Sequence, residues 1–215
     1  MKAAALISGG KDSFLAALVG SEMGMELVSA LTYIPVQDSE MFHVPNIKNA
    51  NLVSSLLGLE TIYYDEREFE SSFKDLKKSG IECVISGAIA SDYQKTRIEK
   101  YCTDAGLLSF TPLWRLDPFI VLNEIVLRAI EAIIISVSAE GINEKFLGRR
   151  FDTVLIADLM RLHEKYGINP AGEGGEYESF VLGLPGAKRI KIISQQTKWS
   201  GSSGYMDIEC TLEES

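Results

Sequence analysis

A glycine turn between an apolar run and a helical pattern constrains this chain most strongly. The turn (residues 8–13, SGGKDS) follows the short apolar run 2–7, typical of a buried strand, and precedes residues 14–19, which suit a helix. Glycine lets backbone N–H groups approach an anion closely, and the positive end of the new helix dipole points at the same place. We therefore predict that this glycine turn binds phosphate, with Lys11 adding a full positive charge.

The glycine turn is not a Walker A loop, which requires G-x-x-x-x-G-K-[ST]. Ala5 stands where the first glycine of that motif would be, and Asp12 follows Lys11. The turn instead resembles the PP-loop of the ATP pyrophosphatases, which split ATP between its α and β phosphates and commonly adenylate an oxygen of their substrate. The alternative is an ordinary strand–turn–helix corner with a solvated lysine.

Composition limits the class of protein. With 215 residues, of which 46% are hydrophobic, the chain can bury one large domain or one domain with a small appendage. Polar residues such as Asn123 and Arg128 interrupt the longest apolar candidate, and the N-terminal apolar run is too short for a signal peptide, so we expect a soluble protein. Three widely spaced cysteines without a C-x-x-C pair predict a reducing, cytoplasmic location and no zinc ribbon.

A net charge of −9 argues against stable binding of nucleic acid, which normally requires a basic surface. ATP would therefore be held by a local site together with Mg²⁺. The charge does not determine the oligomeric state, for which a homodimer is one option.

Apolar runs alternate with helical patterns, which indicates an α/β fold with a doubly wound, mostly parallel sheet. Beyond about residue 130 the alternation weakens and glycines accumulate, so we predict an ATP-binding domain at 1–130 and a smaller α+β subdomain at 131–215. The predicted strands are 2–7, 27–34, 60–64, 82–87, 107–111 and 132–138, and the predicted helices are 12–22, 46–57, 68–79, 91–105, 118–129 and 153–166.

Ligands of such sheets bind at the carboxyl ends of the strands, so the loops after the strands are candidates for the site. The loop at 87–94 begins the helix 91–105, and Ser91 and Gln94 lie close to the centre of that helix's apolar stripe. We predict that both residues line the pocket. An N-cap role is the alternative for Ser91.

A second glycine-rich segment, the glutamate loop (residues 172–179, GEGGEYES), makes a poor core segment and a good ligand-lining loop. If the chain is extended from Glu176 onward, Glu176 and Glu178 point to one face with Cα atoms about 6.6 Å apart. Two carboxylates at that spacing suit a quaternary ammonium, ammonium itself or a metal ion. An acidic, solvated hairpin is the alternative.

Six motifs together resemble the diphthine–ammonia ligase family, in order along nearly the whole chain. These are SGGKDS at 8–13, HVPN at 43–46, GAIASDYQ at 87–94, PLW at 112–114, GRR at 148–150 and GEGGEYES at 172–179. The resemblance implies a Rossmann-like fold of the HUP type. It also implies ATP-dependent amidation of diphthine, a modified histidine of translation elongation factor 2: ATP adenylates the carboxylate, pyrophosphate leaves, and ammonia displaces AMP.

Roles follow for individual residues. We expect Lys11, Glu176 and Glu178 to be catalytic, with Asp12 as the magnesium ligand. Because Asp12 lies in the first turn of the predicted helix, capping of that helix is the alternative for its carboxylate. Tyr177 is a candidate for a cation–π contact with the substrate, and a carboxylate could take a proton from ammonium. The expected ATP ligands are Ser8, Gly9, Gly10, Lys11, Asp12, Ser13, Gly87, Ser91 and Gln94. The expected substrate ligands are His43, Asn46, Asp92, Tyr93, Arg149, Glu173, Gly174, Gly175, Glu176, Tyr177 and Glu178.

Two other functions remain open on the sequence. A tRNA-modifying PP-loop enzyme would more often carry paired cysteines or a basic region, and a regulatory module would bind ATP without turning it over. The chain resembles the short form of the family, and Ala171 stands where other members often have cysteine, so a nucleophilic cysteine is not expected at that position.

Overall fold

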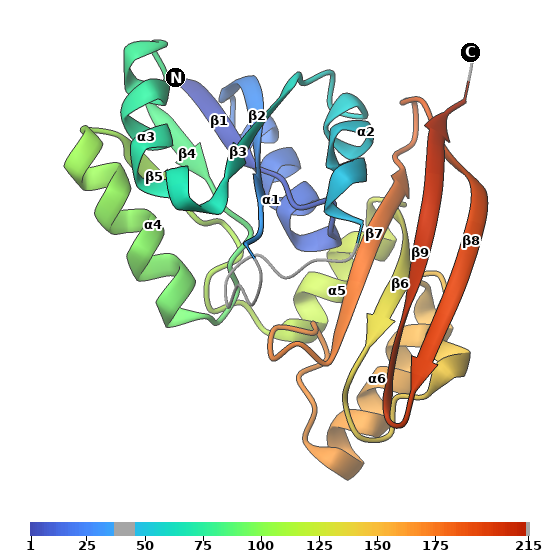
Figure 1. The fold of residues 1–215 in the computed structure, drawn as a ribbon. Helices are drawn as coiled ribbons and strands as arrows, with labels where there is room; N and C mark the ends of the chain where they lie inside the picture. Colours follow the sequence, from blue (N-terminus) through green and yellow to red (C-terminus); the bar gives the residue numbers. More distant parts are fainter. Residues whose placement is uncertain (37–45, 214–215) are drawn as a thin grey trace.

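A parallel five-stranded sheet forms the first half of the molecule. The computed structural model describes residues 1–36 and 46–213. The strand order is β3-β2-β1-β4-β5, so the chain winds outward from β1 in one direction and then in the other (Figure 1). The predicted doubly wound sheet is confirmed. Its strands are β1 (Lys2–Leu6), β2 (Glu26–Ile34), β3 (Thr61–Asp65), β4 (Cys83–Ile85) and β5 (Leu108–Phe110).

Helices cover both faces of this sheet. On one face, apolar residues of α3 one helical turn apart, Phe69, Phe73 and Leu76, pack against Leu31 and Val84 of the sheet. On the other face, α1 buries Phe14 and its neighbours against β1 and against the second half of the molecule. The helices of this half are α1 (Lys11–Glu22), α2 (Ala50–Ser55), α3 (Phe69–Lys78), α4 (Asp92–Ala105) and α5 (Pro118–Leu127), with 3-10 turns at Ile47–Asn49 and Glu66–Glu68.

A four-stranded antiparallel sheet forms the second half, in the order β7-β6-β9-β8. The predicted strand 132–138 is present as β6, and it belongs to this sheet rather than to the parallel one. Helix α6 packs against α5 and buries Leu155 and Leu159. The elements are β6 (Glu131–Val137), a 3-10 turn at Glu144–Phe146, α6 (Thr153–Tyr166), β7 (Tyr177–Gly183), β8 (Ile190–Ser200) and β9 (Ser203–Leu212).

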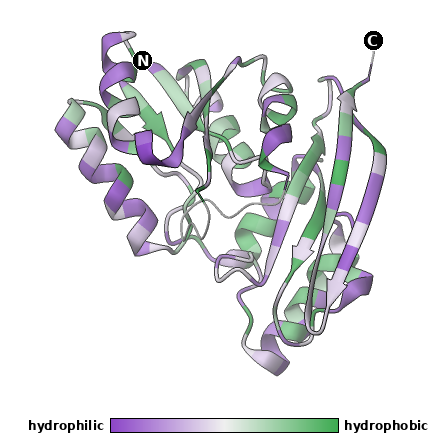
Figure 2. Cartoon of the chain, viewed as in Figure 1, coloured by the Kyte–Doolittle hydropathy of each residue, from purple (hydrophilic) through white to green (hydrophobic). Residues whose placement is uncertain are grey.

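One apolar core joins the two halves. It runs from Ala3 in β1 through α1 to Ile208 in β9, and Figure 2 shows the apolar colour on β1 and β6 with more polar colour on α4 and β8. The backbone N–H of Val181 in β7 also donates to the carbonyl of Gly9, at 3.0 Å. The predicted division at residue 130 stays a prediction, because packing alone does not separate the halves.

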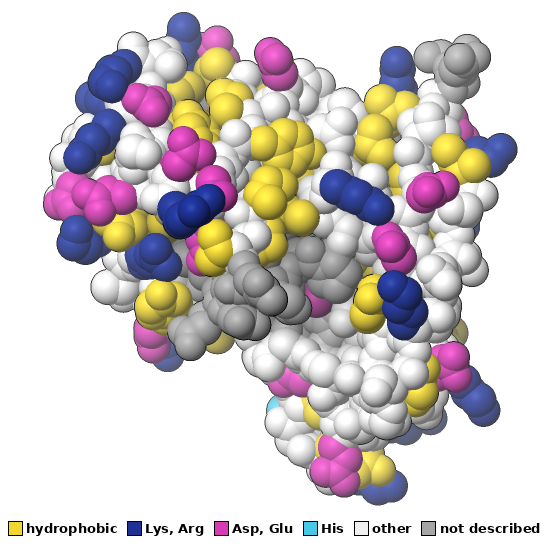
Figure 3. Space-filling view, in the orientation of Figure 1, with side chains coloured by type: hydrophobic (Ala, Val, Ile, Leu, Met, Phe, Trp, Pro, Cys, Tyr) yellow, Lys and Arg dark blue, Asp and Glu magenta, His cyan; other side chains and the backbone are white. Residues whose placement is uncertain are grey.

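Both signs of charge are interspersed on the face drawn in Figure 3. Among the described residues, no helix is both long enough and apolar enough to cross a membrane. The three cysteines are free thiols, of which Cys83 and Cys102 are buried.

Candidate functional site

A cavity of about 1210 Å³ lies between the two sheets, at the carboxyl end of β1. The strand order reverses between β1 and β4, and doubly wound folds bind ligands at such a position. The predicted site residues that line the cavity are Ser8, Gly10, Lys11, Asp12, Ser13, Gly87, Ser91, Gln94, Glu173, Gly174, Gly175, Tyr177 and Glu178.

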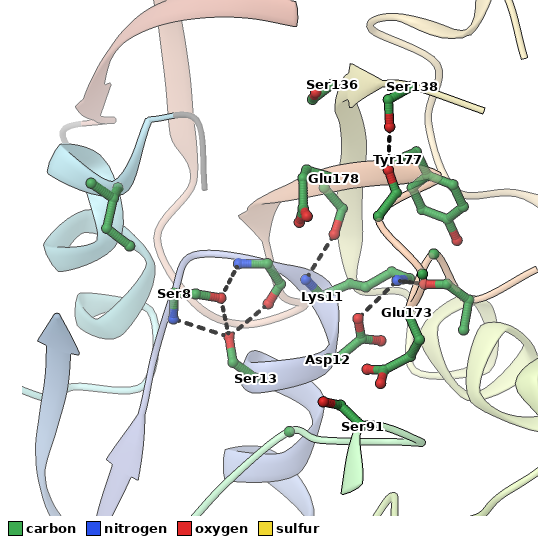
Figure 4. A pocket seen from close by; sticks show the side chains of 18 of the residues that line it. Ser8, Lys11, Asp12, Ser13, Ser91, Ser136, Ser138, Glu173, Tyr177 and Glu178 are labelled. Carbon is green, nitrogen blue, oxygen red and sulfur yellow. Dashed lines mark hydrogen bonds and ion pairs between the residues drawn. The ribbon is translucent and has the colours of Figure 1, made fainter. Parts of the chain in front are cut away.

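The glycine turn forms one wall of this cavity. Gly9 adopts a φ of 93°, a conformation that favours glycine, and the chain then enters α1 at Lys11. The hydroxyls of Ser8 and Ser13 lie 3.2 Å apart, and Ser13 also donates to the carbonyl of Gly10 at 3.0 Å (Figure 4). Hydroxyls and a helix N-terminus on one wall suit an anion such as a phosphate chain.

Gly87 lets the neighbouring loop approach this turn closely. A Cβ atom at position 87 would lie 2.6 Å from the backbone nitrogen of Ser13 and 2.7 Å from the carbonyl carbon of Asp12. Any larger residue would therefore displace backbone rather than a flexible side chain. This contact explains why a glycine follows β4, and it fixes the two loops of the switch point against each other.

The side chain of Lys11 is directed into the protein. It is only 2% exposed, and its Nζ donates to Asp12 Oδ2 at 2.9 Å and to the carbonyl oxygen of Ala171 at 2.6 Å. Nζ also lies 5.0 Å from the ring centroid of Tyr177 and 5.6 Å from that of Phe151. Burial lowers the pKa of Lys11, but the nearby acidic groups, Asp12 first, outweigh it and raise the pKa above its ordinary value. Lys11 is therefore a cation held by partners within the protein.

Asp12 carries a buried oxygen that is available to a metal ion. Its Oδ1 has no hydrogen-bond partner in the part of the chain described, whereas Oδ2 accepts from Lys11. A lone buried carboxylate oxygen beside the serine hydroxyls of the glycine turn fits Mg²⁺, which takes one or two carboxylates and completes its shell with water and phosphate oxygens. No group of three or more His, Cys, Asp or Glu side chains that could hold a metal occurs within residues 1–36 and 46–213.

The three glutamates of the glutamate loop have different environments. Glu173 accepts hydrogen bonds from the backbone N–H groups of Ile89 and Ala90, at 3.3 and 3.0 Å. Glu176 accepts from the backbone N–H groups of Asn169 and Gly174, at 2.7 and 2.8 Å, and is not part of the cavity lining. These two carboxylates stabilise loops. The predicted pairing of Glu176 with Glu178 on one face is not present, because β7 begins only at Tyr177.

Glu178 lines the cavity, as Glu173 does, and its carboxyl group interacts with the charge of Lys11. Burial raises its pKa to about 7, since the positive charge of Lys11 offsets the desolvation only in part and Asp12, Glu173 and Glu176 add repulsion. A carboxyl group that titrates near neutrality can exchange a proton with a bound ligand.

A row of side chains extends from Glu178 across the antiparallel sheet. The strand registers pair Glu178 with Ser136, Ser136 with Tyr205, and Tyr205 with Lys198, and all four residues line the cavity. The sequence does not predict Ser136, Tyr205 or Lys198 as site residues. Their alignment depends on which strands pair and in which register, and no local pattern indicates that.

Two expected ligands are held by contacts within the protein. Asn46 binds the backbone of β9 through Met206 and Ile208. The hydroxyl of Tyr177 donates to the carbonyl of Pro170, and its ring already faces Lys11, so it is not available to a substrate cation.

Three further candidates are not among the residues that line the cavity. Asp92 pairs with Arg115, Tyr93 is 56% exposed beside Arg97, and Arg149 pairs with Asp158 at 2.6 Å. Ser91 caps α4 by accepting from the N–H of Gln94 and also lines the cavity. Gly9 supports the turn without lining the cavity, and His43 falls outside the described residues.

Comparisons with known proteins identify the family to which this chain belongs. The family model described as the diphthamide synthase N-terminal domain matches residues 1–109, and the model of the diphthamide synthase C-terminal domain matches residues 117–213. This chain belongs to the diphthamide synthase family. The N-terminal model spans the parallel sheet and the C-terminal model spans the antiparallel sheet, with α5 falling within the C-terminal model (Figure 1).

Curated family members are similar over most of the chain. Diphthine–ammonia ligase of Danio rerio is 32% identical over 92% of this chain and 88% of its own length, and that of Homo sapiens is 33% identical over 90% and 83%. The ligase of Schizosaccharomyces pombe is 29% identical, and this chain spans 40% of its length. A solved structure titled as a predicted subunit of tRNA methyltransferase from Methanocaldococcus jannaschii aligns over 87% of this chain and 99% of its own, with a TM-score of 0.47 and 16% identity.

Proposed function

We propose that this family member catalyses the ATP-dependent amidation of the diphthine carboxylate on translation elongation factor 2, with ammonium as the nitrogen donor. One observation carries the proposal: the glycine turn and Glu178 line one cavity, beside the same lysine. A candidate anion-binding turn and a carboxyl group that titrates near neutrality in the same cavity are what an enzyme needs to bring a nucleotide, an acceptor and ammonium together. The names of the family's curated members support the same reaction.

The first half-reaction activates the acceptor. A carboxylate is a poor electrophile, so its oxygen attacks the α phosphate of ATP, pyrophosphate leaves, and the acyl group now carries AMP as a leaving group. Backbone N–H groups of the glycine turn with the hydroxyls of Ser8 and Ser13 would bind the phosphates. Asp12 Oδ1 would hold Mg²⁺, which neutralises charge on the departing pyrophosphate.

The second half-reaction forms the amide. Ammonium must lose a proton before its nitrogen can attack the acyl carbon. Glu178 is placed to accept that proton, because its raised pKa of about 7 leaves it deprotonated in a useful fraction of molecules at neutral pH. The same carboxylate attracts the ammonium, or the quaternary ammonium of diphthine, into the cavity.

A turnover experiment tests the proposal. The protein is incubated with ATP, Mg²⁺, ammonium and elongation factor 2 that carries diphthine, in the reducing conditions that its free thiols suit. We expect AMP and pyrophosphate in equal amounts and a factor that is lighter by about one dalton, since –OH is replaced by –NH₂. Nucleotide binding without acceptor-dependent AMP would instead identify a regulatory module.

A further inference from the structure

Lys11 lies in the glycine turn, but its side chain contacts the segment that leads into the glutamate loop. Its backbone nitrogen opens α1, yet its ammonium group reaches the carbonyl of Ala171, the residue before the glutamate loop. The other contact of Nζ is Asp12, and two aromatic rings lie beside it. Figure 4 shows Ser8 and Ser13 on one side of Lys11 and Tyr177 on the other.

Moving Nζ to a phosphate would break a buried arrangement. The carbonyl of Ala171 and the carboxylate of Asp12 would both lose a charged donor, and unpaired buried groups are costly. The hydroxyls of Ser8 and Ser13 bond to each other and to the turn's own backbone, so they can reorient toward a phosphate while Nζ keeps both of its partners. Phosphate binding and contact with the glutamate loop can therefore be carried out by different groups, although the sequence predicts that Lys11 binds phosphate.

Two further hydrogen bonds join the same segments. The backbone N–H of Lys11 donates to Ser179 Oγ at 3.1 Å, and the N–H of Val181 donates to the carbonyl of Gly9 at 3.0 Å. These bonds hold the end of the glutamate loop and the start of β7. The bond from Nζ to Ala171 holds the beginning of the loop, so Lys11 anchors it at both ends.

We propose that Lys11 is a positioning residue that fixes the glutamate loop against the glycine turn, and that the phosphates of ATP are bound without its ammonium group. The proposal rests on the proposed function for the identity of the acceptor. Its chemical consequence is alignment: the acceptor carboxylate must meet the α phosphate in line, and a displacement of about 1 Å can cost on the order of 100-fold in rate. Substitution of Lys11 should therefore impair the use of the acceptor while leaving ATP binding nearly unchanged.

The test is Lys11→Met, which keeps the length and apolar body of the side chain and removes the ammonium group. Calorimetric titration with ATP and Mg²⁺ should give a Kd within about threefold of the parent value. Amide hydrogen exchange in residues 171–176 should become at least about tenfold faster. Acceptor-dependent pyrophosphate release should fall by about 100-fold in kcat/KM for the acceptor.

Lys77→Met is the matched control. Its Nζ also donates to a backbone carbonyl, that of Gly106 at 2.7 Å, but on the surface and away from the cavity. All three measurements should stay at the parent value. Lys11→Gln, which keeps a donor able to approach Ala171, should restore part of the loop protection and serves if Lys11→Met does not fold.

Two results would overturn the proposal. The first is an ATP Kd raised by more than about 30-fold in Lys11→Met, and the second is a glutamate loop that exchanges as slowly as in the parent protein. Failure of the proposed function has a different signature, because a parent protein that makes no AMP leaves the exchange experiment unaffected. The exchange experiment alone then decides whether Lys11 holds the loop.

Discussion

The glycine turn and the glutamate loop have similar compositions and use them in opposite ways. In the glycine turn, Ser8 and Ser13 bond mainly to each other and to the turn's own backbone, which faces the cavity. In the glutamate loop, Glu173 and Glu176 bind backbone N–H groups and serve as internal ties. The number of charged residues in a loop therefore does not give the number of groups that bind a ligand, because most of those side chains can instead hold the loop in place.

Glu178→Gln tests the difference between the two segments most directly. If Glu178 alone among the three glutamates handles the proton of ammonium, kcat should fall by about 100-fold or more, the range typical of a lost general base. The Kd for ATP should change little, since the glycine turn is untouched. Glu70 on α3 is exposed, and its Oε1 lies 3.9 Å from Nζ of Lys74. Glu70→Gln is the control and should leave turnover unchanged.

The pH profile at constant total ammonium sharpens the same test. Glu178 has a raised pKa of about 7, so it is protonated and inactive as a base below that pH, and the parent rate should rise with pH and level off above about pH 7. The Glu178→Gln rate should follow free ammonia and keep rising through pH 8. A parent profile that also keeps rising would contradict the assignment.

The second test alters the glycine turn by a substitution in the loop after β4. Gly87→Ala places a Cβ atom 2.6 Å from the backbone nitrogen of Ser13, which must shift the turn. We expect a loss of about 1–3 kcal/mol in the free energy of unfolding, typical of an overpacked site, together with ATP binding weakened at least about tenfold. Urea denaturation and calorimetric titration measure the two effects.

Gly10→Ala is the matched control for this prediction. Gly10 has a φ of −79°, and a Cβ there would meet its nearest atoms, Ser8 Oγ and the Ser179 carbonyl, at 3.4 and 3.5 Å. The fold should keep its stability while phosphate binding suffers, because Gly10 lines the cavity. If Gly87→Ala proves as stable as Gly10→Ala, the close approach of the two loops is not what positions the turn.

The sequence predicts one of these regions better than the other, for a physical reason. The glycine turn is a local feature: a strand, a turn and a helix in sequence, all within residues 2–22, and they occur where expected. The hydrogen bonds of Glu173 and Glu176 go to amides whose positions depend on the folded loop, so no spacing rule could indicate them.

The antiparallel sheet shows the same limit on a larger scale. Strand β6 is apolar and was predicted, whereas β8 (IKIISQQTKWS) is an edge strand that is exposed over most of its length and has little alternation. Its register with β9 brings Lys198 and Tyr205 to the cavity. Side chains that reach a site through pairing between distant strands are therefore visible only in the structure.

The third prediction concerns the hydrogen bonds that Glu176 accepts from the backbone. Glu176→Gln leaves one carbonyl oxygen where two carboxylate oxygens accept from Asn169 and Gly174. We expect a loss of about 1 kcal/mol in the free energy of unfolding, faster amide exchange at Gly174, and a fall in kcat far smaller than that of Glu178→Gln. Equal losses of turnover in the two variants would mean that both glutamates act on the substrate and would remove the distinction between them.

Tyr205, which lies in the row that joins Glu178 to Lys198, should contribute less than the residues above. Tyr205 is 38% exposed and lines the cavity, so it can contact only the outer part of an acceptor. Tyr205→Leu should raise the KM for the acceptor by about threefold to tenfold, the loss of one partly exposed aromatic contact, with kcat and ATP binding unchanged. Tyr166, also 38% exposed but on α6 outside the cavity lining, provides the control variant Tyr166→Leu. A change in kcat rather than KM would place Tyr205 at the reacting atoms and would extend the catalytic wall from β7 to β9.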